Sequence, residues 1–210
     1  MTQTATFDIA VVGAGVAGLA AALGSAQLGL RTALVGPRVP VDRAAAAAPF
    51  DVRIYALAPA AVGLLEQLKA WPAVDLSRVQ AVAKMRVFGD SGSELSFDAY
   101  QAALPTLATI VEESELLRAL GAAVGFAAEL QRIEGTFDAL QPQGEATRLL
   151  LAGGQAIEAR LVVAADGSRS SVRAAAGINA HELSYGQTAV VANFACERPH
   201  QGVALQWFDP

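Results

Sequence analysis

Residues 7–18 of the chain, FDIAVVGAGVAG, decide its fold. The apolar run FDIAVV ends in glycine, which is typical of a strand that is buried on both faces of a parallel sheet. Small and aliphatic residues at 16–28 predict a helix, and RTALVG at 31–36 predicts a second buried strand. A strand, a glycine turn, a helix and a strand in this order form a right-handed βαβ unit. The sequence therefore predicts an α/β fold that begins with a Rossmann-like βαβ domain.

The turn between the first strand and the helix has glycine at three positions, Gly13, Gly15 and Gly18. In a dinucleotide-binding turn the first glycine permits the tight turn, the second lets a pyrophosphate touch the backbone, and the third lets helix and strand pack closely. The backbone N–H groups around Ala14, Gly15 and Val16 then point at the phosphates from the positive end of the helix dipole. These five residues form the predicted diphosphate site.

The end of the second strand departs from the usual dinucleotide pattern. An acidic residue there normally accepts a hydrogen bond from the ribose 2′-hydroxyl. In ALVGPR that position is Gly36, so either another group holds the ribose or the bond is absent. Arg38 could pair with a 2′-phosphate or could be a solvated loop charge. A 2′-phosphate partner would make the chain an NADP-binding dehydrogenase domain.

The composition limits the class of protein. The chain has 210 residues, 53% of them hydrophobic, and a formal net charge of −5. It is long enough to bury a sizeable core, and a negative charge without a basic run argues against nucleic acid as the main partner. A single cysteine, Cys196, suits a reducing compartment and is expected in the core of an apolar strand. With His181 and His200 as the other candidates, no metal-ligand spacing stands out.

The stretch 9–30 carries no charge and is long enough to resemble a membrane span. Five glycines interrupt it, and no basic residue precedes it, as a secretory signal would require. We therefore expect a cytoplasmic protein.

Local patterns predict the remaining elements. A loop is expected at 37–50, and alternation on both sides of 90–93 predicts a hairpin at 83–100. The predicted helices lie at 58–71, 112–125 and 170–177, and the predicted strands lie at 146–167, interrupted at 153–154, at 187–197 and at 202–209.

Two groups of conspicuous side chains have a structural interpretation. Glu112, Glu113 and Glu115 are interpreted as charges that the dipole favours at the start of a helix. Trp207 and Phe208 could line a substrate pocket, but core packing is the favoured role.

The segment LVVAADGSRSSVR at 161–173 is a second signal, because a buried strand ends there in Asp166 and Gly167. With this segment the whole chain resembles the flavoprotein aromatic hydroxylases, and within them the branch that acts in ubiquinone biosynthesis. The matching stretches are VVGAGVAGLAAAL at 11–23, DVRIYALAPAAVGLLEQLKAW at 51–71, ADGSRSSVR at 165–173, and YGQTAVVANFACERPH at 185–200 followed by ALQWF at 204–208.

The resemblance implies FAD as the cofactor and adds three site residues. Arg53 is expected near the FAD phosphates and ribose, where its guanidinium can pair with a pyrophosphate, with a surface salt bridge as the alternative. Asp166 and Gly167 match the family's Asp-Gly motif, where a carboxylate can accept from a ribityl or a backbone donor. Arg173 is expected to form a structural pair. Related enzymes carry Arg, Gln or Asn near Glu113 to face the flavin, and the acid here departs from that pattern.

The resemblance also implies an activity. NADH or NADPH would reduce FAD, and one oxygen atom of O₂ would be added to a small phenolic substrate, for which a prenylated ring in the manner of ubiquinone intermediates is one option. A prenylated substrate would favour peripheral association with a membrane or with a biosynthetic complex. No catalytic acid or base is assignable from the sequence. The alternatives are the NADP-binding dehydrogenase domain, a non-catalytic flavoprotein remnant, and a reductase of the same fold that consumes no O₂.

The resemblance divides the chain into parts of two interleaved domains. Residues 1–75 are expected to begin the FAD-binding domain, and residues 76–108 to insert a hairpin toward a substrate domain with a mixed β-sheet. Residues 109–178 return to the FAD-binding domain with the Asp-Gly motif, and residues 179–210 begin the substrate-domain sheet. The family's later Gly-Asp segment, which closes over the flavin, has no counterpart, because FGDSGS at 88–93 lacks that motif's neighbours. We therefore expect the first half of a longer protein.

Overall fold

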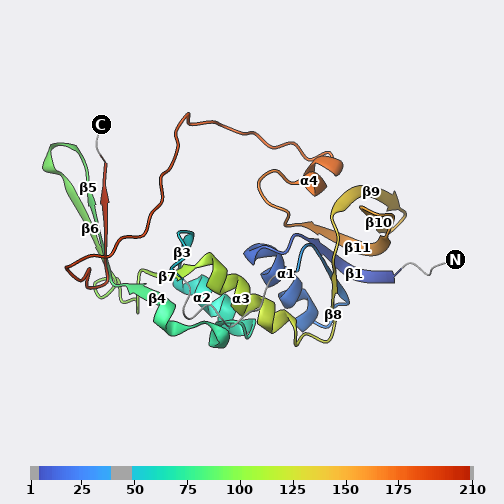
Figure 1. Ribbon diagram of the computed structural model, residues 1–210, viewed down its shortest axis with the longest axis horizontal. Coiled ribbons are helices and arrows are strands. Elements are labelled where there is room, and N and C mark those ends of the chain that lie inside the picture. The colour runs from blue at the N-terminus through green and yellow to red at the C-terminus, as the bar shows by residue number, and fades with distance from the viewer. Residues whose placement is uncertain (1–4, 39–48, 209–210) are drawn as a thin grey trace.

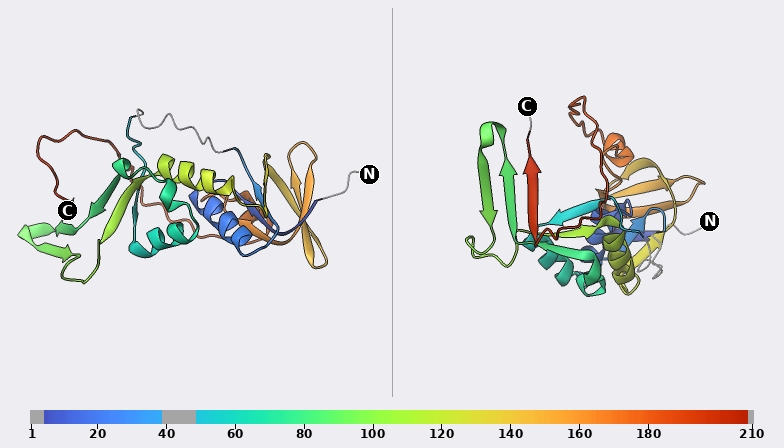
Figure 2. Two further views of the ribbon diagram at one scale, coloured as in Figure 1. Left: turned by 90° about the horizontal axis from the view of Figure 1, so that it is seen from below. Right: turned by 60° about the vertical axis from the view of Figure 1, so that its left-hand side comes forward.

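The computed structural model describes residues 5–38 and 49–208, so most of the predicted loop at 37–50 lies outside the described residues. The described residues form an elongated molecule with three sheets (Figure 1). A six-stranded sheet lies at one end and a three-stranded sheet at the other, and the three longer helices and a second three-stranded sheet lie between them (Figures 1 and 2). The helices are α1 (Val16–Gln27), α2 (Pro59–Gln67), α3 (Glu113–Val124) and α4 (Ser171–Ala175), with short 3₁₀ turns at Trp71–Ala73, Leu76–Arg78 and Asp90–Gly92.

The six-stranded sheet contains the predicted βαβ unit. Its strand order is β8-β2-β1-β11-β10-β9, and the first four of these strands run parallel. The last two strands are antiparallel to their neighbours. The α/β fold is therefore confirmed. The strands are β1 (Ala5–Val12), β2 (Thr32–Val35), β8 (Leu130–Ile133), β9 (Phe137–Gln143), β10 (Ala146–Leu151) and β11 (Ala156–Ala164).

Both faces of this sheet are buried, because its central strands are apolar on both sides. Alternate residues of β2 enter different core clusters: Leu34 packs with the helices α1 and α3, whereas Ala33 and Val35 pack on the opposite face. On the first face Leu19 of α1 and Leu120 of α3 are fully buried. The uncharged stretch 9–30 is thus accounted for by a buried strand and a helix of a globular core.

Helix α1 ends within one residue of the predicted range 16–28, and a glycine follows it. The helix stops at Gln27, and Gly29 follows with a φ of 79°, a left-handed conformation typical of the residue after a helix. No atom lies within 4 Å of a Cβ built on Gly29. Gly29 therefore terminates the helix and makes no close packing contact with the sheet.

The two smaller sheets are formed by strands from distant parts of the chain. One has the order β3-β7-β4 and is antiparallel, and the other has the order β12-β5-β6 and contains the predicted hairpin. Strands β3, β4, β7, β8 and β9 have no counterpart in the sequence-based prediction, because most are only four or five residues long. The strands are β3 (Ile54–Leu57), β4 (Val79–Val82), β5 (Lys84–Phe88), β6 (Glu94–Asp98), β7 (Ala108–Glu112) and β12 (Val203–Trp207).

The predicted strand at 187–197 is wrong. Residues 178–200 contain neither helix nor strand and are exposed, and they form the long arc between α4 and β12 in Figure 1. Strand β5 pairs in parallel with β12, and none of the described strands pairs with this apolar segment. Cys196 is accordingly exposed and is not a core residue.

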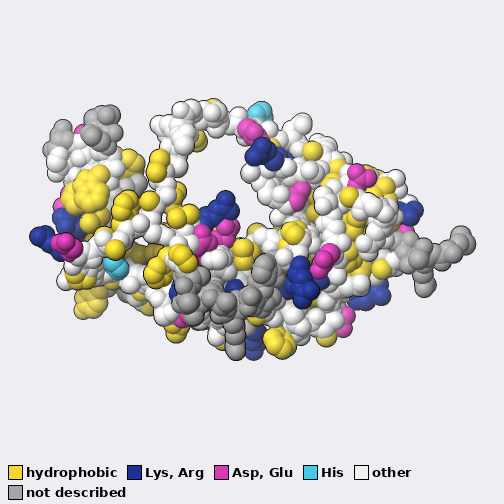
Figure 3. Space-filling model, viewed as in Figure 1, with side chains coloured by type: hydrophobic (Ala, Val, Ile, Leu, Met, Phe, Trp, Pro, Cys, Tyr) yellow, Lys and Arg dark blue, Asp and Glu magenta, His cyan; other side chains and the backbone are white. Residues whose placement is uncertain are grey.

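The aromatic residues at the end of β12 are also not in the core. Trp207 and Phe208 are 64% and 58% exposed. The ring of Trp207 stacks on that of Phe88 at 5.1 Å between centroids. Hydrophobic side chains are exposed at this end of the molecule (Figure 3). A strand at the edge of a sheet with three members has too few neighbours to bury such large rings.

Candidate functional site

The glycine turn has the close packing that its spacing predicts. Gly13 has a φ of 115°, and a Cβ built on it would lie 2.1 Å from the carbonyl oxygen of Ala165 on the neighbouring chain segment. A Cβ on Gly18 would lie 1.8 Å from the carbonyl oxygen of Gly13. Both positions therefore exclude a side chain for reasons internal to the fold.

Gly15 differs from the other two glycines. No atom of the protein lies within 4 Å of a Cβ built on it, so the space beside it is open. Gly15 is the N-cap of α1, no side chain caps this end, and the first turn contains no acidic residue. The start of α1 at Gly15 thus faces open space, and a helix N-terminus with free N–H groups is the arrangement that binds phosphate.

The Asp-Gly turn lies beside the glycine turn because β11 runs parallel to β1. Val12 pairs with Ala164, and the amide of Ala165 donates to the carbonyl oxygen of Val12 at 2.8 Å. The carboxyl ends of parallel strands meet at one edge of a sheet, so Asp166 and Gly167 emerge next to Gly13. A φ of 98° at Gly167 explains why glycine occupies that position.

The carboxylate of Asp166 organises the start of α4. It accepts hydrogen bonds from the Ser170 hydroxyl and, at 3.1 Å, from the amide of Val172. Burial raises the pKa of Asp166, but these hydrogen bonds outweigh it, and the pKa lies below its ordinary value. Arg173 donates to the carbonyl oxygen of Ser168 at 2.8 Å, which is a structural contact of the kind expected for it.

A cleft of about 440 Å³ collects most of the predicted site residues. We call it the turn cleft and define it by Gly13, Ala14, Gly15, Asp166 and Gly167, which all line it. Val16 and Gly18 do not line it; they belong to the first turn of the helix behind it.

Arg53 lies apart from the turn cleft. Its guanidinium pairs with the carboxylate of Glu113 at 2.9 Å and is 76% exposed, and the hydroxyl of Tyr55 donates to the other oxygen of that carboxylate. The hydrogen bond to Glu113 raises the pKa of Arg53. The structure therefore brings together seven of the eight predicted residues around one turn and leaves Arg53 in an exposed ion pair.

A second, larger cleft of about 890 Å³ adjoins the turn cleft and shares Ala14, Gly36 and Pro37 with it. We call it the arginine cleft, because Arg38, Arg118 and Arg132 line it. The remaining lining is largely apolar, with one carboxylate, that of Glu134. Sequence reasoning singled out Arg38 but missed Arg132 and Glu134, because β8 itself was not predicted.

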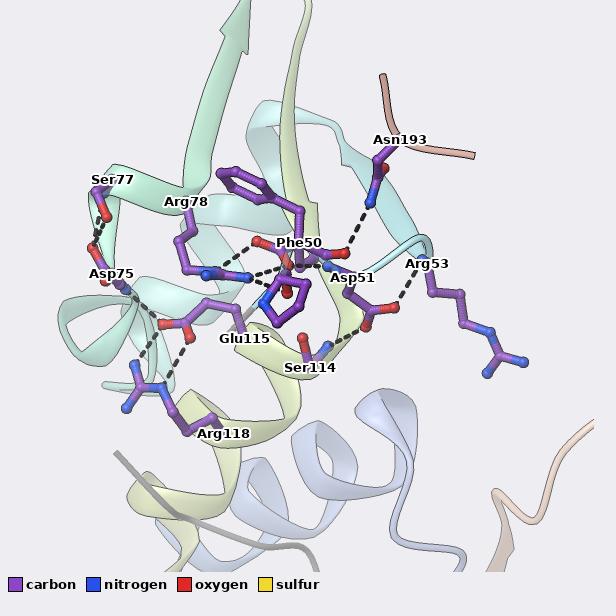
Figure 4. A network of polar contacts seen from close by, with 12 residues as sticks. Phe50, Asp51, Arg53, Asp75, Ser77, Arg78, Ser114, Glu115, Arg118 and Asn193 are labelled. Atoms are coloured by element: carbon purple, nitrogen blue, oxygen red, sulfur yellow. Dashed lines mark hydrogen bonds and ion pairs between the residues drawn. The ribbon is translucent and has the colours of Figure 1, made fainter. Parts of the chain in front are cut away.

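The acidic residues lie at the start of α3, as predicted, with Glu112 as the N-cap and Glu113 and Glu115 in the first turn. Two of them, Glu112 and Glu115, are also buried in ion pairs, which the sequence did not indicate. Glu112 is 3% exposed and accepts from Nε and Nη2 of Arg78 at 2.8 and 2.6 Å, and it also accepts from the amide of Asp51. Glu115 is 3% exposed and pairs with Arg118 at 2.5 Å (Figure 4). Glu112 ties the start of α3 to Asp51 and Arg78, and Glu115 ties it to the amide of Asp75, which donates to its carboxylate at 2.6 Å. The pairing of Glu112 with Arg78, which lies 34 residues away, is not visible in the local sequence.

The described ranges hold no group of three or more His, Cys, Asp or Glu side chains placed to bind a metal. Their longest helices have 12 residues, and none is long and apolar enough to cross a bilayer, which takes about 20 residues.

These features define a class: α/β proteins that bind a dinucleotide cofactor at the carboxyl edge of a parallel sheet. Within that class, the chain belongs to the FAD binding domain family, whose model matches residues 6–204. The predicted family and the predicted FAD-binding fold are thereby confirmed.

The curated relatives are hydroxylases of ubiquinone biosynthesis. The chain is 35% identical over 211 residues to 3-demethoxyubiquinol 3-hydroxylase of Escherichia coli (strain K12), covering 100% of this chain and 54% of that protein. It is 34% identical over 205 residues to ubiquinone hydroxylase UbiL of Rhodospirillum rubrum, covering 97% of this chain and 47% of that protein. The chain thus spans about half the length of the curated relatives it matches.

Solved structures agree on the fold. PqsL of Pseudomonas aeruginosa, described as a probable FAD-dependent monooxygenase, matches 86% of this chain and 48% of its own with a TM-score of 0.66 and 22% identity. p-Nitrophenol 4-monooxygenase PnpA of Pseudomonas putida DLL-E4 matches 83% of this chain and 44% of its own with a TM-score of 0.66 and 16% identity.

Proposed function

We propose that the chain is the FAD-binding part of a monooxygenase that hydroxylates an aromatic ring, with a ubiquinone-biosynthesis intermediate as the substrate class. One observation carries the proposal: the uncapped start of α1 opens into the turn cleft, directly beside the Asp-Gly turn. The names of the relatives support the substrate class, and the family supports the cofactor.

The residues present fit an adenine dinucleotide. The open space at Gly15 lets a diphosphate reach the N–H groups at the start of α1. A side chain at Gly13 or Gly18 would overlap backbone atoms of the turn itself. Asp166 retains acceptor capacity after its contacts with Ser170 and Val172, since an ionised carboxylate has about four acceptor sites. It can therefore hold a hydroxyl of the cofactor without giving up the start of α4.

Arg53 can still contribute to phosphate binding. Its pair with Glu113 is exposed to solvent, and exposed ion pairs are weak. A diphosphate offers the guanidinium a stronger partner than one carboxylate, so Arg53 would exchange Glu113 for the cofactor when FAD binds. The roles predicted for the residues of the glycine turn and the Asp-Gly turn are likewise part of this proposal.

FAD, when bound, supplies the redox chemistry that carries electrons from NADH or NADPH to O₂. In the balanced reaction the ring gains a hydroxyl group, the second oxygen atom leaves as water, and the nicotinamide loses a hydride. The chain's own contribution is to bind and orient the cofactor and to hold its diphosphate. The division into FAD-binding residues 1–75 and 109–178 and substrate-domain residues 76–108 and 179–210 belongs to this proposal. So do a cytoplasmic location and peripheral association with a membrane.

Titration of the purified chain with FAD and, separately, with NADPH tests the proposal. Binding of FAD, followed by quenching of flavin fluorescence, is the expected result. Consumption of NADPH that depends on FAD and a phenol, with a product one oxygen atom heavier by mass spectrometry, would establish the activity. Tight binding of NADPH without flavin would instead support the dehydrogenase domain. Protein that stays colourless after refolding with FAD would support a non-catalytic remnant.

A further inference from the structure

The carboxyl ends of β2 and β8 place two residues side by side in the arginine cleft. The strands are parallel, and Val35 pairs with Ile133. The amide of Gly36 donates to the carbonyl oxygen of Ile133 at 3.2 Å, so pairing continues past the strand ends. Glu134 therefore follows β8 where Gly36 follows β2, about 4.8 Å apart, the spacing of neighbouring strands.

Glu134 also lies on the same face of the sheet as Gly36. Leu34 and Arg132 are register partners, and both line the arginine cleft. Val35 and Ile133, one residue further, are buried in the core of the opposite face. Alternation then returns Gly36 and Glu134 to the first face, and both line the cleft.

Gly36 itself has little space for the usual acid. A Cβ built on it would lie 3.1 Å from both the amide nitrogen and the Cβ of Ala14, in the glycine turn. An acidic side chain at this position would therefore make a tight contact with Ala14, in the turn proposed to bind the diphosphate. The same charge one strand away, on exposed Glu134, reaches the cleft without that contact.

Arg38 and Arg132 line the same cleft as this carboxylate. Burial lowers the pKa of Arg132, and so does the positive charge of Arg38. Arg132 also donates to the carbonyl oxygen of Gly121 at 2.6 Å, which fixes its position. Two arginines alone would suit a phosphate, but a carboxylate in the same cleft opposes a further dianion and favours a neutral diol.

We propose that Glu134 accepts hydrogen bonds from the adenosine ribose of the cofactor, replacing the acid absent from position 36, and that it selects against a 2′-phosphate. This inference rests on the proposed function, because it assumes that an adenine dinucleotide lies along the two clefts. It names a recognition residue that has no counterpart in the usual glycine-turn pattern, and it opposes the NADP alternative suggested by Arg38.

The proposed contact of Glu134 with the ribose is tested by calorimetric titration of the full chain with ADP, 2′-deoxy-ADP, 2′,5′-ADP and FAD. The variant is Glu134→Ala. The matched control is Glu129→Ala, which removes an exposed acid from the opposite end of β8. We expect the parent chain to bind ADP about tenfold more tightly than 2′-deoxy-ADP, as one charged hydrogen bond requires. Glu134→Ala should lose that preference, bind FAD about tenfold more weakly, and bind 2′,5′-ADP more tightly than the parent does. Glu129→Ala should match the parent.

Two results would overturn the inference: equal binding of ADP and FAD by Glu134→Ala and the parent, or a parent that prefers 2′,5′-ADP to ADP. A parent that binds ADP with the expected preference but does not bind FAD would overturn the proposed function and leave the role of Glu134 intact. A parent that binds neither ligand would refute both. A melting temperature of Glu134→Ala equal to that of the parent would show that any loss of binding is local.

Discussion

Replacement of Gly15 by valine tests the physical basis of the site most directly. Gly15 has a φ of −75°, which any residue can adopt, and no protein atom lies within 4 Å of an added Cβ. The fold therefore accepts Gly15→Val at the cost of a poorer N-cap, about 1 kcal/mol. In a chain of this length that lowers the melting temperature by about 2–4 °C.

The effect on the cofactor should be far larger than the effect on stability. The valine side chain occupies the space through which a diphosphate reaches the backbone at the start of α1. Loss of two charged hydrogen bonds, each about 1.5–3 kcal/mol, weakens binding by at least about 3 kcal/mol. That free energy corresponds to a hundredfold or greater increase in the Kd for FAD, since about 1.4 kcal/mol is tenfold.

Flavin fluorescence gives the Kd, and melting with and without excess FAD gives an independent measure of binding. Gly63→Val is the matched control, because Gly63 in α2 also has no atom within 4 Å of an added Cβ and lies outside both clefts. It should bind FAD as the parent does. A folded Gly15→Val protein with the parent's affinity for FAD would refute the placement of the diphosphate at this turn.

Three further predictions concern stability. Gly18→Ala should lower the free energy of unfolding by about 3 kcal/mol or more in urea, because the new methyl group would meet a backbone oxygen at 1.8 Å; an unchanged urea midpoint would contradict the packing. Glu112→Ala leaves Arg78 buried without its carboxylate and should cost about 3 kcal/mol. The control Glu94→Ala, which breaks an exposed pair, should cost much less, and equal losses would rule out burial as the cause. Because folding lowers the pKa of Asp166, its stabilising effect is present above the ordinary value of 3.8 and is lost as the pH falls below it. The free energy of unfolding of Asp166→Asn should therefore fall less steeply than that of the parent as the pH is lowered. An equal slope would show that this carboxylate does not cause the loss of stability in acid.

The local sequence was sufficient to predict the βαβ unit and the glycine turn. An uninterrupted apolar strand, three glycines at fixed spacing and a small-residue helix are constraints within about thirty residues, and each has a local physical cause. The steric reasons assigned to Gly13 and Gly18 agree with the contacts that a Cβ would make there. The position of Asp166 beside the turn could also be expected, since both strands are buried and parallel strands end at a common edge.

Only the tertiary structure decided which distant segments meet. The bidentate pair of Glu112 with Arg78, the parallel pairing of β12 with β5 and the approach of Glu134 to Gly36 each join residues far apart in the chain. The local sequence around each of these residues does not identify its partner. The fold decides which residue pairs with a given charge and which strand pairs with a given short strand. The exposure of 178–200 is likewise not visible in the local sequence, since a segment with strand-forming composition becomes a strand only where the fold pairs it with a neighbouring strand.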